Sequence, residues 1–148
     1  MVGLLTPYGG CPLPRAGRTR TVSAAQARSY VAKADEYLAA ATSELDAGRS
    51  IAATSLAIHA GINAADAVTG MRIGRRAAGQ DHDEVLKLLR EAGQDGAEVE
   101  RSLSRLLPLK TKAEYEPDDI PRPEAKRAVE RAARCVAVAT RVASQGHP

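Results

Sequence analysis

The sequence has almost no aromatic side chains and no long apolar run. Its 148 residues include four Tyr, no Phe and no Trp, so aromatic residues make up 3% of the chain. A β-sandwich or β-barrel would need more aromatic and β-branched residues. No uninterrupted apolar run approaches the roughly 18 residues that a membrane span requires. We therefore expect neither an all-β fold nor a transmembrane helix, and no membrane among the partners.

Cysteine and histidine are too scarce for a disulfide framework or a metal centre. The two cysteines, Cys11 and Cys135, lie far apart, and His59, His82 and His147 lack paired ligand spacing. The chain also has no phosphate-binding Walker loop, no dinucleotide fingerprint and no nucleophile elbow, so no metal or cofactor is expected. The first residues lack the basic and apolar regions of a signal peptide, and a cytoplasmic location is expected.

The positive charge of the chain is confined to its first residues. The formal net charge is +3, and residues 1–22 contain Arg15, Arg18 and Arg20 but no Asp or Glu. The remaining residues are therefore neutral overall, which weakens any argument from charge to nucleic-acid binding. The same 22 residues are rich in Gly and Pro and have no periodicity. We predict a flexible basic leader over residues 1–22 and one domain over residues 23–148.

Apolar residues at three- and four-residue steps predict an all-α, up-and-down bundle of about five helices, three long and two shorter. Ser23 and Asp81 are good N-terminal caps, and Gly48, Gly70 and Gly93 are good stop signals. Pro108 is expected to kink a helix or start a new turn. The predicted ranges are 23–45, 50–68, 81–92, about 95–107 with 109–115 as its continuation, and 123–143.

Ser55, His59, Asn63 and Asp66 form a polar stripe on the second predicted helix. Their spacings of four, four and three residues place them on one helical face. The stripe is predicted to line a cleft or a subunit seam, where Asp66 could orient the His59 imidazole for proton transfer. The alternative is a polar seam or a solvated face without a ligand.

A basic segment follows that helix. Arg72, Arg75 and Arg76 lie among glycines, ahead of Asp81 and His82 at the start of a helix. Guanidinium groups together with backbone N–H groups at a helix N-terminus predict a phosphate site. The alternative is a solvated loop in which Asp81 only caps the helix.

A third polar cluster, from Lys110 to Pro117, contains Lys112, Glu114 and Tyr115. A Lys-rich turn that ends in a Tyr of the buried type, before a Pro-rich loop, predicts a fixed structural corner. Lys112 and Glu114 could equally be surface groups.

Four motifs follow one another along the chain: Lys33-Ala34-x-x-Tyr37-Leu38, His59-Ala60-x-x-Asn63-Ala64-Ala65-Asp66, Gly74-Arg75-Arg76-x-x-Gly79-x-Asp81-His82, and Leu106-Leu107-x-Leu109-Lys110-x-Lys112-Ala113-Glu114-Tyr115. Their order resembles that of the HEPN superfamily (higher eukaryotes and prokaryotes nucleotide-binding), and of a small stand-alone actinobacterial type within it. The likeness covers roughly residues 24–144 and ends in an alanine-rich helix.

The resemblance implies a bundle of four or five helices that is often a homodimer. Many members are metal-independent endoribonucleases, including toxins of toxin–antitoxin pairs, in which an Arg and a His with four to six residues between them line one cleft. Arg76 and His82 have that separation here, and His59 is a further candidate for catalysis. The candidate ligand-binding residues are Asn63, Asp66, Arg72, Arg75, Lys110, Lys112, Glu114 and Tyr115.

The resemblance leaves three functions open. In many ribonuclease members the motif precedes the last helix and ends in Tyr, but the matching stretch here offers Glu114 where a His is expected. An ionised Glu114 would repel phosphate, which favours a nucleotide- or RNA-associated interaction module without conventional catalysis. The alternatives are a metal-independent ribonuclease and a purely structural bundle. The expected partners are a second copy, RNA or a nucleotide, and a cognate protein.

Overall fold

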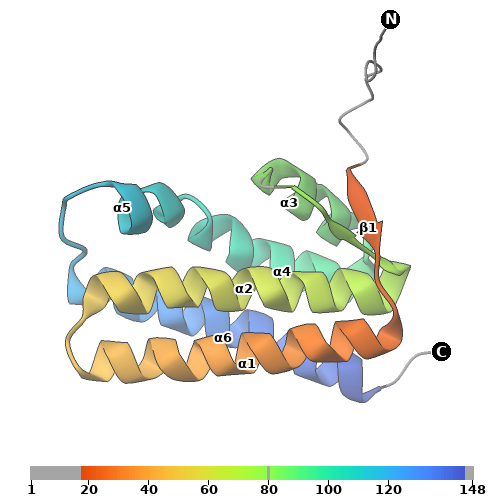
Figure 1. The fold of residues 1–148 in the computed structure, drawn as a ribbon, viewed down its shortest axis with the longest axis horizontal. Coiled ribbons are helices and arrows are strands. Elements are labelled where there is room, and N and C mark those ends of the chain that lie inside the picture. Colours follow the sequence, from red (N-terminus) through yellow and green to blue (C-terminus); the bar gives the residue numbers. More distant parts are fainter. Residues whose placement is uncertain (1–17, 80, 146–148) are drawn as a thin grey trace, which may run out of the picture.

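The computed structural model describes residues 18–79 and 81–145, which form a helical bundle with one small sheet. The elements are β1 (Thr19–Thr21), α1 (Ala24–Asp46), α2 (Ser50–Ile73), β2 (Arg75–Ala77), α3 (His82–Glu91), α4 (Gly93–Leu106), α5 (Leu109–Tyr115) and α6 (Arg122–Ser144). The long helices lie side by side with α4, while α3 and α5 lie along one side of α2 (Figure 1). The predicted all-α bundle is confirmed. The described residues hold six helices rather than five, because 109–115 form a helix of their own.

α2 is the centre of the bundle and packs against each of the other five helices. Ala is the commonest of its buried residues, and Gly61, Ile58, Val68 and Met71 are also among them. Small side chains let neighbouring helices approach closely, which is the packing that the scarcity of aromatics predicts.

The same helix is long and apolar enough, by length and composition, to cross a membrane. A few polar residues interrupt its apolar sequence, so it is not an uninterrupted apolar run of the kind considered above. In the bundle, 67% of its most apolar window is buried inside the protein, as in the core helix of a soluble protein.

The predicted start of α1 and one of the two predicted helix ends agree with the structure. Ser23 Oγ accepts a hydrogen bond from Gln26 N (3.1 Å) and Gln26 Oε1 accepts one from Ser23 N (2.9 Å), so α1 begins in a reciprocal capping box. Gly48, at φ +81°, follows α1 as predicted. α2 does not end at Gly70, however, but continues to Ile73 and ends at Gly74, which has φ +70°.

Gly70 serves close packing instead of helix termination. A Cβ added there would lie 2.6 Å from Cγ1 of Val22, a buried residue just after β1. The glycine therefore makes room for the chain that enters α1. The sequence predicts a helix end at Gly70 because the helix-stop pattern considers only neighbouring residues, and Val22 lies 48 positions away in the sequence.

β1 and β2 pair as a two-stranded antiparallel sheet, although α1 and α2 lie between them in the sequence. Thr19 is opposite Ala77, Arg20 opposite Arg76 and Thr21 opposite Arg75. Val22 N donates to Gly74 O (2.8 Å), which extends this pairing. The predicted boundary of the leader at residue 22 is therefore wrong, because residues 18–22 belong to the fold. The rest of the predicted leader, with Cys11, and also His147, lie outside the described residues.

Cys135 is a buried core residue of α6. Burial raises the pKa of its thiol to about 12, and its Sγ lies 3.9 Å from the Val99 carbonyl oxygen as a weak donor. A thiol in this environment stays protonated and unreactive at neutral pH.

We expect Gly70→Ala to lower the free energy of unfolding by about 1–2 kcal/mol, because the overpacking against Val22 outweighs the better helix propensity of Ala. Val22→Ala in the same chain should recover part of that loss, so that the two substitutions together cost less than their sum. Urea denaturation followed by circular dichroism measures all three variants. Strict additivity would show that Val22 does not pack on Gly70.

Candidate functional site

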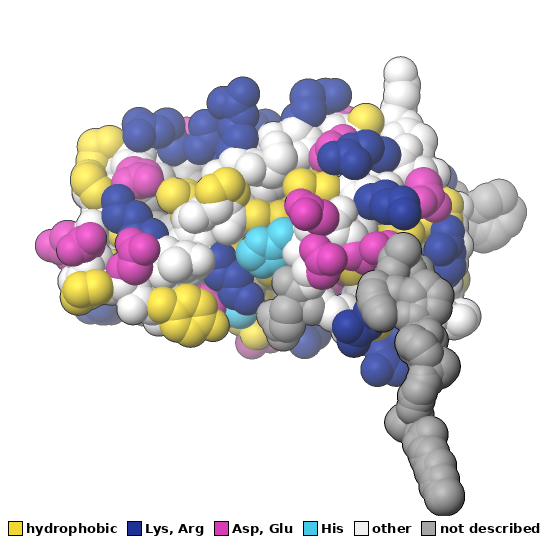
Figure 2. All heavy atoms as spheres, turned by 90° about the horizontal axis from the view of Figure 1, so that it is seen from above, with side chains coloured by type: hydrophobic (Ala, Val, Ile, Leu, Met, Phe, Trp, Pro, Cys, Tyr) yellow, Lys and Arg dark blue, Asp and Glu magenta, His cyan; other side chains and the backbone are white. Residues whose placement is uncertain are grey.

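A pocket of about 230 Å³ opens on the side of α2 that faces α3 and α5. Four elements contribute to it, since α2, β2, α3 and α5 each supply an ionisable side chain. Figure 2 looks onto this side of the molecule and shows histidine near its centre, with basic and acidic side chains around it. The lining residues are His59, Ile62, Asp66, Arg76, Ala77, Gly79, His82, Val85 and Lys110.

His59 is held at the pocket by contacts on both sides. Its Nε2 lies 3.5 Å from Glu114 Oε2 on α5, and its ring centroid lies 5.3 Å from that of Tyr37 on α1. Ser55 Oγ donates to the same Glu114 oxygen (3.3 Å). The His59 side chain is 41% exposed, so solvent and a ligand can reach it. Glu114 thus orients the His59 imidazole. The sequence shows only that Glu114 stands where the family motif has a His, and not that it contacts His59.

The predicted polar stripe of α2 is confirmed as one face, but its members differ in role. Asn63 is buried, and its Nδ2 donates to the carbonyl oxygen of His59 (2.8 Å), so it bonds the helix backbone one turn earlier. Asp66, which is also buried, lines the pocket directly. His59 and Asp66 therefore both belong to the pocket, but the acidic neighbour within 4 Å of the imidazole is Glu114.

Arg76 reaches the pocket from β2. Its guanidinium lies 5.6 Å from the ring centroid of Tyr30 on α1, as in a cation–π contact. Its Nη1 also donates to Ala77 O (3.0 Å). Arg20 of β1 is directly opposite Arg76, and opposite residues of an antiparallel pair share a face. The sheet thus gathers positive charge beside the pocket.

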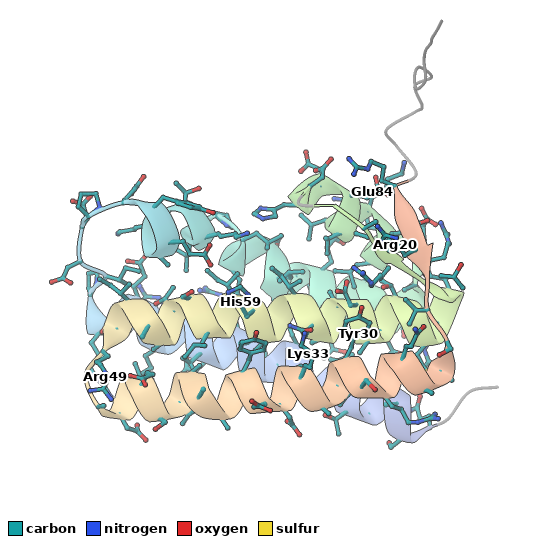
Figure 3. The ribbon with its side chains drawn as sticks, viewed as in Figure 1. Arg20, Tyr30, Lys33, Arg49, His59 and Glu84 are labelled. Atoms are coloured by element: carbon teal, nitrogen blue, oxygen red, sulfur yellow. The ribbon has the colours of Figure 1, made fainter. Side chains whose placement is uncertain are left out.

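α1 contacts the lining residues without lining the pocket itself: Tyr37 lies against His59, Tyr30 against Arg76, and the charge of Lys33 acts on Asp66. The sequence alone does not connect these α1 residues with the pocket. Tyr30, Lys33 and Tyr37 are spaced by three and four residues, so they share one face of α1. Figure 3 shows Tyr30 and Lys33 projecting from α1 toward α2, and His59 on the α2 side beneath α3 and α5. The helical spacing of these three residues is visible in the sequence. Only the packing of α1 on α2 shows that their common face meets the pocket residues.

Burial controls the charge of Asp66. Desolvation raises the pKa of its carboxyl group to about 7, although Arg76 and Lys33 lower that pKa by their positive charge. The carboxyl group therefore gains and loses its proton near neutral pH. A pocket with a protonated Asp66 is more positive than one with an ionised Asp66, so its affinity for anions depends on pH.

His82 and Lys110 complete the pocket. His82 is the first residue of α3, and the cap residue before it, Asp81, accepts a hydrogen bond from Asp83 N (2.9 Å). The role of Asp81 as a helix cap is confirmed. Its carboxylate already occupies one of the free N–H groups of α3, so the cationic side chains of the pocket are better placed for an anion than this helix terminus.

The predicted three-arginine phosphate site is not formed. Arg72 lies in the last turn of α2 and bonds Asp95 of α4, with Nη2–Oδ2 at 2.7 Å. Arg75 pairs with Glu91 (3.0 Å). Because consecutive strand residues point to opposite faces, Arg75 and Arg76 diverge, and Arg76 is the one of the three that lines the pocket.

The cluster over 110–117 is also divided. Lys110 lines the pocket, whereas Lys112 pairs with Glu124 of α6 (3.4 Å) and ties α5 to that helix. Tyr115 is 74% exposed, so the expected buried Tyr at a fixed corner is wrong. It ends a seven-residue helix with no buried residue, so nothing covers its ring.

A larger hollow, of about 520 Å³, lies at the far end of the bundle, at the turn between α1 and α2. Its ionisable lining consists of Arg49, which pairs with Glu44, and Asp119. Within residues 18–79 and 81–145, no three His, Cys, Asp or Glu side chains are grouped as metal ligands. The chemistry-bearing residues therefore gather at the smaller pocket.

No protein-family model matches this sequence, and no curated protein matches it. The chemical assignment of the pocket therefore comes from its own side chains. Two imidazoles, a guanidinium, an ammonium and a carboxyl group of raised pKa can together bind an anion and move protons.

We expect the stability of the protein to fall as the pH rises from about 4 to about 7. In this window the folded state keeps the Asp66 proton while the unfolded state loses it, which amounts to about 4 kcal/mol above pH 7. Asp66→Asn removes that cost, so its stabilising effect should be small near pH 4 and largest at pH 8. Urea denaturation at both pH values measures it.

Asp35→Asn is the matched control, since Asp35 is an exposed carboxylate of α1. It should show no such growth between pH 4 and pH 8. Equal effects of both substitutions at all pH values would show that Asp66 has an ordinary pKa.

Proposed function

We propose that this chain is a HEPN-like protein whose pocket binds the phosphate group of a nucleotide or of an RNA chain. The observation that carries the proposal is the convergence of His59, Asp66, Arg76, His82 and Lys110 on one pocket. These side chains come from four separate elements, and a solvated face would not gather them. Arginine, lysine and protonated imidazole are the side chains that bind phosphate oxygens most strongly.

The size of the pocket favours a single phosphate group as the ligand. Its volume of about 230 Å³ is below the roughly 300–1,000 Å³ of sites that enclose a whole small molecule. Its lining includes two imidazole rings but no Tyr ring, so base stacking contributes little. A phosphate with part of its sugar fits inside, and the rest of a nucleotide or an RNA chain would lie outside.

Glu114 does not count against phosphate binding in this arrangement. It is not among the lining residues, and its carboxylate lies against His59 and Ser55. The Glu114 carboxylate is thus directed at these two side chains, so it repels a phosphate in the pocket less than a lining carboxylate would.

Metal-independent RNA cleavage is a second candidate, and the contact between His59 and Glu114 favours it. A carboxylate beside an imidazole stabilises the imidazolium that forms when the imidazole takes a proton. His59 would take the proton of a 2′-hydroxyl group, whose oxygen attacks phosphorus. His82 would give a proton to the departing 5′ oxygen, while Arg76 and Lys110 stabilise the phosphate charge.

The resemblance to HEPN proteins adds support from the order of the motifs, and it extends the proposal to a homodimer in the cytoplasm. In such a dimer a second copy of the pocket would contact the same RNA. Light scattering of the full chain gives the mass in solution and tests that part separately.

We expect adenosine 5′-monophosphate to bind and adenosine without phosphate to bind at least tenfold more weakly, as isothermal titration calorimetry measures. Arg76→Gln should raise the Kd for the nucleotide by about 10- to 100-fold, because a charge-assisted hydrogen bond is lost. Arg90→Gln, which removes an exposed α3 charge paired with Glu100 outside the pocket, is the control and should bind normally. Equal binding of adenosine and its monophosphate would refute phosphate recognition.

If the second candidate is right, the protein cleaves mixed RNA in the presence of a chelator. His59→Gln and His82→Gln should each lower the rate by about 100- to 10,000-fold, the range for loss of a general acid or base. Arg28→Gln is the control, because it removes an exposed charge of α1 that lies outside the pocket. Absence of cleavage alongside nucleotide binding would leave the binding function alone, and absence of both would favour a bundle that only packs against a partner protein.

A further inference from the structure

Five arginines lie together on α4 and α6, away from the pocket. Arg101 and Arg105 belong to α4, and Arg127, Arg131 and Arg134 belong to α6. Four of them, all except Arg127, line a groove of about 310 Å³ together with Glu98 and Ser102. We call these five residues the arginine groove.

None of the five forms an ion pair with any residue in 18–79 or 81–145, and the same holds for Arg28, Arg76 and Arg122, which lie apart from one another. Arg49, Arg72, Arg75, Arg90 and Arg141 each have a carboxylate partner. Glu98, the one acidic residue that lines the groove, lies 3.4 Å from Arg141. The four lining arginines outnumber this carboxylate, so the groove keeps a net positive charge.

The crowding of these like charges opposes folding. Partial burial lowers the pKa of Arg131, and the charges of Arg105, Arg134 and Arg127 lower it further, while the charge of Glu130 raises it. Like charges on neighbouring helical positions destabilise a helix. An arrangement that costs stability and recurs along two helices is more typical of a binding surface than of a solvated face.

The two rows of arginines face each other along the groove. Arg101 and Arg105 are four residues apart, and Arg127, Arg131 and Arg134 follow at four and three, so each row is one helical face. α4 and α6 run antiparallel, since Asp95 near the start of α4 bonds Arg141 near the end of α6 (2.8 Å). At 1.5 Å per residue the α6 row is about 10 Å long, enough for a run of successive phosphate groups.

The groove and the pocket are separate sites. They share no lining residue, and α4 and α6 supply nothing to the pocket. Figure 2 shows Lys and Arg side chains gathered along one edge of the view, beyond the histidine at its centre.

We propose that the arginine groove binds the sugar–phosphate backbone of single-stranded RNA, while the pocket takes one phosphate group of the same chain. The second clause rests on the proposed function. Guanidinium groups match phosphate oxygens in pairs, and an extended backbone can follow a row of them. The groove is a backbone contact without base recognition, because no aromatic ring lines it.

An acidic protein is the competing occupant, and the surface does not favour it. The residues that contribute most to protein interfaces are Trp and Tyr as well as Arg, and they sit in well-packed pockets. Within residues 18–79 and 81–145, the exposed large apolar residues are Ile51 and Tyr115, neither of which lies on α4 or α6. A polyanion bound by charge alone needs no such anchor.

The test uses the full chain and a labelled 15-nucleotide single-stranded RNA with 2′-O-methyl groups, which a ribonuclease of this kind cannot cleave. Fluorescence anisotropy gives the Kd at several salt concentrations, with chelator present. Arg105→Gln/Arg134→Gln should weaken binding at least tenfold and reduce the slope of log K against log salt by about 1.4, since each lost phosphate contact contributes about 0.7. Binding of adenosine 5′-monophosphate, which reaches only the pocket, should be unchanged.

Arg28→Gln/Arg122→Gln is the matched control, because it removes two exposed arginines that lie outside the groove. It should change the RNA affinity less than threefold. The proposal is overturned if both double variants behave alike, if the natural chain does not bind the RNA, or if a 15-residue polyglutamate binds as tightly as the RNA. In each of these cases the nucleotide titration still decides the proposed function of the pocket.

The effect of the crowded charges on stability gives a second test, measured as a melting temperature. Arg131→Met keeps the length of the aliphatic stem and removes the charge, so it should raise the melting temperature by about 1–3 °C at low salt. The gain should shrink in 0.5 M KCl, because salt screens the repulsion. A lower melting temperature at low salt would show that the arginines stabilise the fold, and would overturn the argument that they are held there for a ligand.

Discussion

The burial of α2 among all five other helices is the constraint on which the rest of the structure depends. A helix enclosed in this way must present small apolar side chains on most of its surface, and a polar group on it needs a hydrogen-bond partner or an opening to solvent. Asn63 has the first, in the carbonyl oxygen of His59, and His59 has the second. Asp66 has little of either and shifts its pKa instead. The candidate site therefore lies where the core helix meets the surface.

Features that depend on neighbours in sequence were predicted well. The all-α class, the Ser23 and Asp81 caps and the common face of His59 and Asp66 follow from spacing and capping over a few residues. Features that depend on distant contacts were not. Gly70 looked like a helix stop but faces Val22, and Arg75 and Arg76 looked like one cluster but lie on opposite faces of a strand that pairs with β1.

The short sheet links the first described residues to the candidate site. Its register sets Arg76 across from Arg20 and beside Tyr30, and the Val22–Gly70 contact fixes the chain just before α1. Residues that composition assigned to a flexible leader thereby help to position the guanidinium at the pocket. A three-residue strand gains this influence because it is anchored at both ends, by Val22 N on Gly74 O and by Ala78 N on Arg18 O.

Net charge is a poor guide to what this protein binds, because its charges are sorted in space. Residues 23–148 are neutral overall, which argued against a broad basic face. Yet several carboxylates form ion pairs between elements of the fold, and Asp95 pairs with both Arg72 and Arg141. Asp95 and Glu98, near the start of α4, pair with Arg141, near the end of α6. Arg101 and Arg105 of α4, and Arg127, Arg131 and Arg134 of α6, form no ion pair with any residue in 18–79 or 81–145. The balance of charge over the domain is thus compatible with a strongly positive groove, since local pairing decides where the positive potential remains.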